Sequence, residues 1–256
     1  MRNIRVVFAV LSLSVVLVAG VADELQAQEK RQGWTKRLRY RRELRRELQG
    51  EIQLSGAFAL YPMAVKWAEE FRKIHPKVRI DISAGGAGKG ITDALAKVVD
   101  LGMVSRDIYP QELEKGAFPI AVVKDAVVPT INSNNPLIDQ ILATGLKQQV
   151  AQDLWIHTTA RTWGDVLGTG STIPVHVYTR SDACGAAETF AAWLGAKQED
   201  LEGTAVFGDP GVTSVVQRDK VGIGFNNIAY AYDINSKKPY RHIAVIPLDL
   251  NGNGKI

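Results

Sequence analysis

An arginine and an aspartate, Arg180 and Asp182, stand in the stretch TRSDACGAAE (residues 179–188), between a predicted strand and a predicted helix. The planar fork of a guanidinium suits the oxygens of an anion, and a nearby carboxylate can orient it. The only cysteine of the chain, Cys184, lies at the turn of this stretch. A thiolate at a helix N-terminus can act as a nucleophile, but it needs a base, and the sequence places none there, since His176 lies eight residues upstream. We therefore interpret Cys184 as a small residue that lines a pocket.

Three loops share one plan, in which a strand leads through small residues into the start of a helix. They cover residues 55–62, 83–90 and 179–188. The first N–H groups of a helix have no partner within it, and the helix dipole is positive there, so three such ends that converge would hold an anion. Arg106 follows another predicted strand and is a second candidate cation. The glycine loop at 85–90 matches neither the P-loop nor the dinucleotide-binding pattern.

The composition narrows the classes of function. A single cysteine excludes an intramolecular disulfide and a cysteine-cluster metal site, and the four histidines lack the spacing of metal ligands. We expect neither a metal nor a cofactor. The net charge of +4 comes from the N-terminal part of the chain. The first 50 residues hold 11 Lys and Arg against 5 Asp and Glu, whereas residues 51–256 hold 20 Lys and Arg against 22 Asp and Glu.

The N-terminus has the pattern of a targeting segment. Residues 1–22 combine two arginines, an apolar run of about 14 residues and small residues at 20–22, which predicts a cleaved signal peptide and a periplasmic location. An uncleaved membrane anchor is the alternative, but the run is short for a span of about 20 residues. Residues 23–50 are predicted to form a basic linker or exposed helix, with nucleic-acid or lipid binding as the alternative.

Strands and helices alternate after residue 50, which predicts an α/β fold with largely parallel sheets. Residues 63–75 carry apolar side chains at helical spacing, and residues 77–83 alternate in the manner of a half-buried strand. The apolar run at 120–132 is predicted to be one long strand that passes deep through the molecule. A turn at 133–136 marks a boundary, and residues 242–250 are predicted to form the last strand.

Five separated blocks resemble, in order and spacing, the phosphate-binding proteins of ABC transporters. The blocks are SGAFALYPMAVKWAEEF, ISAGGAGKGITDAL, VDLGMVSRDI, VYTRSDACGAAETF and VGIGFNNIAYAYD. The resemblance implies a two-lobed, type II periplasmic binding protein fold that holds an anion in its cleft and closes by hinge motion. It also implies a division into lobe 1 at 51–128, lobe 2 at 129–241 and, at 242–256, a strand that returns to lobe 1, whose closing helices are expected to be missing.

The resemblance also implies, residue by residue, which positions contact the ligand. Arg180 and Asp182 match the pocket arginine and its aspartate. The family's SGT motif falls on Cys184, Gly185 and Ala186, so the serine and threonine hydroxyls are replaced. The full set of implied positions is Leu60, Tyr61, Ala87, Gly88, Arg106, Arg180, Asp182, Cys184, Gly185 and Ala186.

These observations predict an exported, monomeric solute-binding protein, not an enzyme, that binds phosphate or a related small oxyanion and delivers it to an ABC permease. The replaced hydroxyls leave two alternatives open. The ligand is another oxyanion or a small carboxylate, or the chain is a degenerate member that signals or acts as a scaffold without a tight ligand. An enzyme that depends on Cys184 is a third alternative.

Overall fold

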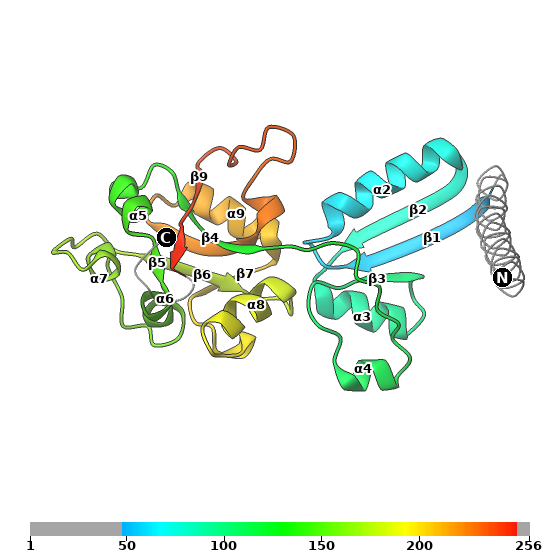
Figure 1. Cartoon of the computed structure of the whole chain (residues 1–256), viewed down its shortest axis with the longest axis horizontal. Coiled ribbons are helices and arrows are strands. Elements are labelled where there is room, and N and C mark those ends of the chain that lie inside the picture. Colours follow the sequence, from blue (N-terminus) through cyan, green and yellow to red (C-terminus); the bar gives the residue numbers. More distant parts are fainter. Residues whose placement is uncertain (1–47, 250–256) are drawn as a thin grey trace, which may run out of the picture.

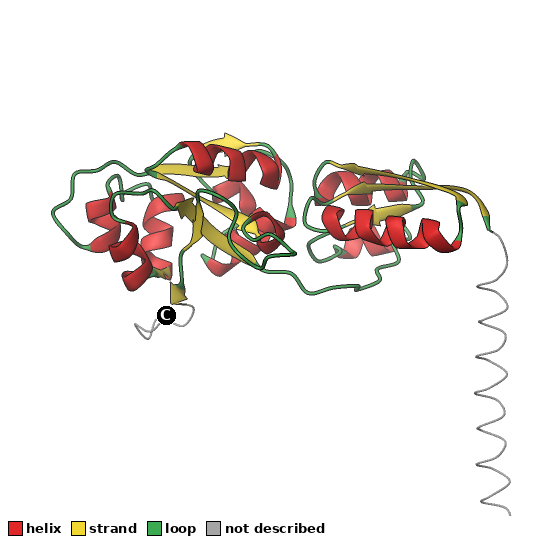
Figure 2. Cartoon of the chain, turned by 90° about the horizontal axis from the view of Figure 1, so that it is seen from above, coloured by secondary structure: helices red, strands yellow, loops and turns green. Residues whose placement is uncertain are grey.

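The protein, seen in a computed structural model that describes residues 48–249, consists of two α/β lobes side by side along its long axis (Figure 1). The predicted signal peptide and almost all of the predicted linker lie outside the described residues. Seen from above, each lobe contains both helices and strands, with loop segments between the two bodies (Figure 2). The two-lobed α/β fold class is confirmed.

The first lobe contains a parallel three-stranded sheet in the order β2-β1-β3. Strand β2 alternates as expected, with Val78 and Ile80 buried against Ala68 of α2, and with charged side chains on the opposite face. Such a half-buried strand gains its stability from one apolar face. In chain order the elements are β1 (Gln49–Gly56), α2 (Tyr61–Ile74), β2 (Lys77–Ala84), α3 (Ala87–Leu95), β3 (Leu101–Met103) and α4 (Pro110–Glu114).

The second lobe is built on a five-stranded sheet in the order β7-β6-β8-β4-β9. Strand β6 is parallel to β7 and β8, whereas β4 is antiparallel to β8 and β9. The prediction of a largely parallel sheet is therefore wrong for this lobe, because β4 enters the sheet from the opposite end. Its elements are β4 (Val127–Asn132), α5 (Ile138–Thr144), β5 (Leu146–Lys147), α6 (Gln148–Trp155), α7 (Trp163–Leu167), β6 (His176–Arg180), α8 (Gly185–Trp193), η1 (Gln198–Asp200), β7 (Thr204–Val206), α9 (Gly208–Arg218), β8 (Gly222–Asn227), η2 (Ile228–Tyr230), β9 (Ile243–Val245) and β10 (Leu248–Asp249).

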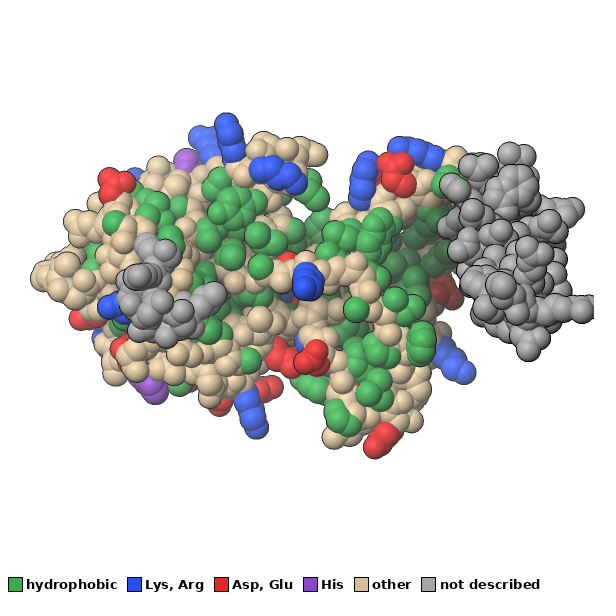
Figure 3. Space-filling view, in the orientation of Figure 1, with side chains coloured by type: hydrophobic (Ala, Val, Ile, Leu, Met, Phe, Trp, Pro, Cys, Tyr) green, Lys and Arg blue, Asp and Glu red, His purple; other side chains and the backbone are tan. Residues whose placement is uncertain are grey.

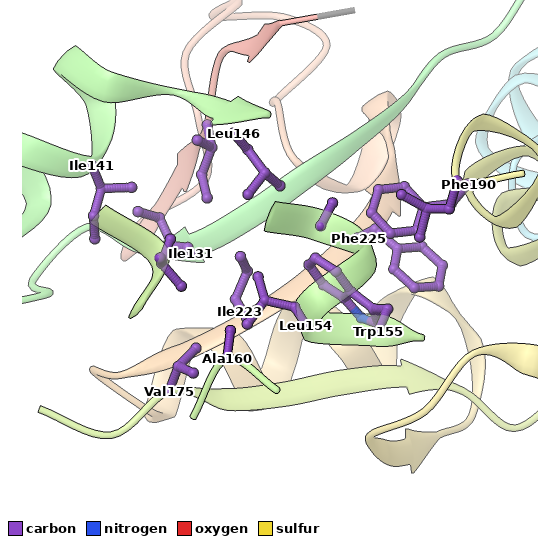
Figure 4. Packing of buried hydrophobic residues seen from close by; sticks show 14 of the residues in the cluster. Ile131, Ile141, Leu146, Leu154, Trp155, Ala160, Val175, Phe190, Ile223 and Phe225 are labelled. Carbon is purple, nitrogen blue, oxygen red and sulfur yellow. The ribbon is translucent and has the colours of Figure 1, made fainter. Parts of the chain in front are cut away.

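Three aromatic side chains organise the core of the second lobe (Figure 4). Phe190 of α8 stacks on Phe225 of β8 with ring centroids 4.5 Å apart, and Trp155 of α6 meets Phe190 edge-on at 4.9 Å. Aromatic pairs of this kind contribute about 0.5–1.5 kcal/mol beyond their buried area. They fix α8 on the sheet, and α8 begins at the lobe interface.

Two strand predictions are corrected by the structure. Only residues 127–132 of the predicted strand at 120–132 form a strand, as β4; residues 117–126 cross between the lobes without a ladder partner, and Phe118 is 86% exposed. The strand expected to return to lobe 1 instead pairs, as β9, with β4 of the second lobe, and β10 pairs with β5. Both errors concern which strand, distant in sequence, pairs with the segment in a sheet, and an apolar run does not specify that neighbour.

Candidate functional site

The starts of α3 and α8 meet where the two lobes touch. The backbone N–H of Gly88 donates to the carbonyl of Ala183 at 3.3 Å. A Cβ at Gly185 would lie 1.8 Å from the carbonyl oxygen of Ser105, so only glycine permits this approach between the lobes. Two of the three predicted helix ends thus converge, and each brings N–H groups with no partner inside its helix.

Arg180, the last residue of β6, is the buried cation at this junction, and its side chain is 0% exposed. Its Nε and Nη2 donate to the two carboxylate oxygens of Asp182 at 2.9 and 2.7 Å, and its Nη1 donates to Asp209 at 2.8 Å. A guanidinium has five N–H donors. One N–H on Nη1 and one on Nη2 therefore have no protein acceptor within residues 48–249, and each can donate to an anion.

Both carboxylates are held by further bonds. Asp182 also accepts from the N–H of Gly208 at 3.0 Å, and Asp209 accepts from the N–H of Asn227 at 2.9 Å. Burial raises the pKa of Asp209, although the charge of Arg180 opposes the shift. Burial alone would lower the pKa of Arg180, but its bonds to the carboxylates outweigh that effect and raise the pKa. With both carboxylates ionised, the cluster has one excess negative charge.

Cys184 is the N-cap of α8, and its Sγ accepts from the N–H of Ala187 at 3.5 Å. Burial raises the pKa of the thiol to about 12, so it is neutral at physiological pH. His176, at the opposite end of β6, pairs with Asp219 at 2.7 Å and supplies no base to Cys184. The geometry therefore lacks the features of a cysteine nucleophile.

Arg106, which was expected to contact the ligand, is bound by protein side chains. Its guanidinium makes two bonds to Glu112, at 2.7 and 2.9 Å, and lies 4.0 Å over the ring of Tyr109. Its Nε is also 3.7 Å from Glu188 of α8, and the Tyr109 hydroxyl donates to Glu188 at 3.1 Å. Since Glu188 belongs to the second lobe, these residues form a polar contact between the lobes.

The other predicted positions separate into two groups. Ala87, Gly185 and Ala186 are buried in the first turns of α3 and α8, beside Gly88 and Cys184. Leu60 and Tyr61 lie at the start of α2, where Leu60 packs on the first-lobe core and Tyr61 lines a groove between the lobes. The structure thus brings together the starts of α3 and α8 with Arg180 and Asp182, and leaves Leu60 and Arg106 in other contacts.

Two polar residues of the site were missed from the sequence. Asp209 lies in GDPG (residues 208–211), which follows the same strand–loop–helix plan as the three loops that were selected, so this plan was the usable indication. Ser105 follows β3, and its Oγ would lie 2.5 Å from a Cβ at Gly185. This hydroxyl has no hydrogen-bond partner among the residues that the structure describes. Its place in the block VDLGMVSRDI, directly before Arg106, was the usable indication.

An aromatic groove of about 750 Å³ opens between the lobes beside Arg180, and both lobes contribute to it. Figure 3 shows the surface indented between the lobes, with hydrophobic side chains next to the indentation. The Phe58 ring lies 6.0 Å from the Arg180 guanidinium carbon, and the Tyr230 hydroxyl donates to the Phe58 carbonyl at 2.9 Å. The groove is lined by Phe58, Tyr61, Pro62, Val65, Ile82, Ser83, Ala84, Pro210 and Tyr230.

Residues 42–244 match the family model described as the PBP superfamily domain. The chain belongs to the PBP superfamily. The match includes both lobes of this PBP chain and every residue of the site above. In the part of the chain that the structure describes, no helix is long and apolar enough to cross a membrane.

Several relatives of this PBP chain are named phosphate-binding proteins, which confirms the resemblance seen in the sequence blocks. It is 28% identical to the protein SphX of Synechococcus elongatus over 80% of the chain and 60% of that protein, and 28% identical to the phosphate-binding protein PstS of Xylella fastidiosa over 70% of the chain and 54% of that protein. The chain thus spans little more than half the length of these curated relatives. A crystal structure of a putative phosphate ABC transporter substrate-binding protein from Clostridium perfringens, with bound phosphate, superposes with a TM-score of 0.68 at 25% identity, over 78% of this chain and 76% of that one.

Proposed function

We propose that this chain is an exported, periplasmic solute-binding protein that binds phosphate or a related small oxyanion between its lobes and delivers it, as a monomer, to an ABC permease. The observation that carries the proposal is the unused N–H pair of the buried Arg180 beside the starts of α3 and α8. A cation that is buried and still has two free donors is prepared for an anion rather than for packing alone. The names of the PstS relative and of the superposed phosphate-bound structure support phosphate as that anion.

The site would hold the anion with four kinds of donor. These are the Nη1 and Nη2 groups of Arg180, the N–H groups of Gly185 and Ala186 at the start of α8, the start of α3 and the Ser105 hydroxyl. Asp182 keeps the guanidinium oriented through its two bonds. The cross-lobe contact of Arg106, Tyr109 and Glu188 would stabilise the closed form around the anion.

A second candidate function is that of a signalling or scaffold member without a tight ligand. Two observations favour it. The single positive charge of Arg180 is already paired with two carboxylates, those of Asp182 and Asp209, and the lobes touch directly through Gly88 and Ala183. The two candidates differ in whether an anion binds tightly.

Isothermal titration with phosphate, sulfate and acetate tests the proposal. We expect saturable binding of phosphate with one site per chain. Arg180→Lys keeps a cation between the buried carboxylates but removes the fork, so it should weaken phosphate by about tenfold or more, while the exposed Arg218→Lys should bind as the unmodified chain does. No heat with any of the anions would favour the scaffold candidate.

A further inference from the structure

The chemistry of the aromatic groove differs from that of an inorganic anion. Its walls are the rings of Phe58, Tyr61 and Tyr230 with the aliphatic side chains of Val65 and Ile82. Oxyanions are held by N–H and O–H donors, whereas pockets of about 300–1,000 Å³ lined by apolar and aromatic side chains are typical of small organic ligands. A groove of about 750 Å³ therefore exceeds what an inorganic oxyanion needs, and its lining is mostly apolar, with Ser83 and the two tyrosines as the hydroxyl-bearing residues.

The groove lies near the anion site. The Phe58 ring faces the Arg180 guanidinium, with 6.0 Å between the ring centroid and Cζ. Pro210, on the opposite lobe, directly follows Asp209, which binds Nη1 of Arg180. A ligand with its oxyanion on Arg180 would thus direct any substituent between Phe58 and Pro210.

The donor set is also small for four oxygens. The first turns of α3 and α8 carry Ala87, Cys184 and Ala186 and no hydroxyl, so Ser105 is the hydroxyl at this junction. A thiol is a much weaker hydrogen-bond donor than a hydroxyl. In a phosphate monoester or a phosphonate, one of the four oxygens is replaced by an ester oxygen or a carbon, which needs little or no hydrogen bonding.

We propose that the ligand of this site is an organic phosphate or phosphonate, with its oxyanion on Arg180 and one apolar or aromatic substituent in the groove. This inference rests on the proposed anion-binding function and narrows its ligand class. The substituent would contribute by burying apolar surface against Phe58 and Tyr61.

Calorimetric titration of the unmodified chain with inorganic phosphate, methyl phosphate, phenyl phosphate and phenylphosphonate tests the inference. We expect phenyl phosphate to bind about tenfold or more tighter than inorganic phosphate, with methyl phosphate in between. Comparing the affinities of phenyl phosphate and phenylphosphonate shows whether the site prefers a phosphate ester or a phosphonate with a direct carbon–phosphorus bond. Phenol, which has the ring without the oxyanion, should not bind.

Two matched variants test whether the groove causes the tighter binding of phenyl phosphate. Phe58→Leu should reduce the ratio of phenyl phosphate to phosphate affinity, whereas Phe118→Leu, at a position that is 86% exposed and outside the groove, should leave that ratio unchanged. Tight phosphate binding with weaker or no ester binding would overturn this inference and leave the proposed function intact. No binding of any phosphorus ligand would overturn both, and phenol binding as tight as phenyl phosphate would overturn the ligand class.

Discussion

Arg180 lies between two buried carboxylates, and the charge that they carry decides how the site behaves. Asp182 and Asp209 accept three of its N–H bonds, and one N–H on each of Nη1 and Nη2 remains free of protein acceptors within residues 48–249. The sequence predicted Arg180 and Asp182 from their type and spacing. It did not predict Asp209, because the two residues are 29 positions apart and meet only through the fold.

The pH dependence of stability tests the state of Asp209. Because burial raises its pKa, the folded chain keeps a proton on Asp209 at a pH where the unfolded chain, near 3.8, has lost it. The stability contributed by this group is therefore lost as the pH rises from 3.8 through the raised value. Asp209→Asn removes this component, so the excess stability of the unmodified chain over the variant should shrink in urea unfolding as the pH rises above 3.8. A stability excess that grows with pH would show that Arg180 instead lowers the pKa of Asp209. The variant Asp139→Asn, at an exposed position, is the control.

Cys184 provides a second test at the scale of the residue. Cys184→Ser replaces a weak acceptor at the N-cap of α8 with a strong one, which typically stabilises a helix by about 1 kcal/mol. Its hydroxyl would also donate to the bound anion, so phosphate affinity should rise by about tenfold. Thermal unfolding and calorimetry measure the two effects. Cys184→Ala, which has neither group, should show neither gain, and an equal gain in both variants would refute the role of the hydroxyl.

At the scale of the element, the starts of α3 and α8 form the site because small residues let the two lobes approach. The strand–loop–helix plan was visible in the sequence, and it indicated that these loops would form an anion site if they converged. The partners of Arg106 were not visible, because its bonds to Glu112 and Glu188 depend on where α4 and α8 are placed. The same limit explains β9: its apolar pattern predicted a strand but not that β4 would be its neighbour.

The cross-lobe contact should influence how far the lobes separate. Glu188→Gln removes the charge opposite Arg106, and Tyr109→Phe removes the hydroxyl that donates to Glu188. Each variant should increase the radius of gyration of the ligand-free chain in small-angle X-ray scattering, because the closed form loses a contact of about 0.5–1.5 kcal/mol. The exposed Glu199→Gln should have no effect. Identical scattering from all variants would mean that this contact does not hold the lobes together.

At the scale of the whole molecule, two lobes meet over a polar junction with an aromatic groove beside it. The sequence predicted two lobes through its resemblance to a family, and the relatives and the superposed structure agree with that prediction. The groove could not be predicted, since Phe58 and Pro210 come from different lobes and lie 152 positions apart. In the proposed function the junction would select an anion, and in the further inference the groove would bind the substituent of that anion.

A crystal structure of the chain grown with phosphate tests the central claim most directly. We predict tetrahedral density within hydrogen-bonding distance of Nη1 and Nη2 of Arg180 and of the N–H groups at the start of α8. The direct contact between Gly88 and Ala183 should lengthen to admit the anion. An empty junction at saturating phosphate, with Gly88 still bonded to Ala183 and Arg180 bound only by Asp182 and Asp209, would contradict the claim.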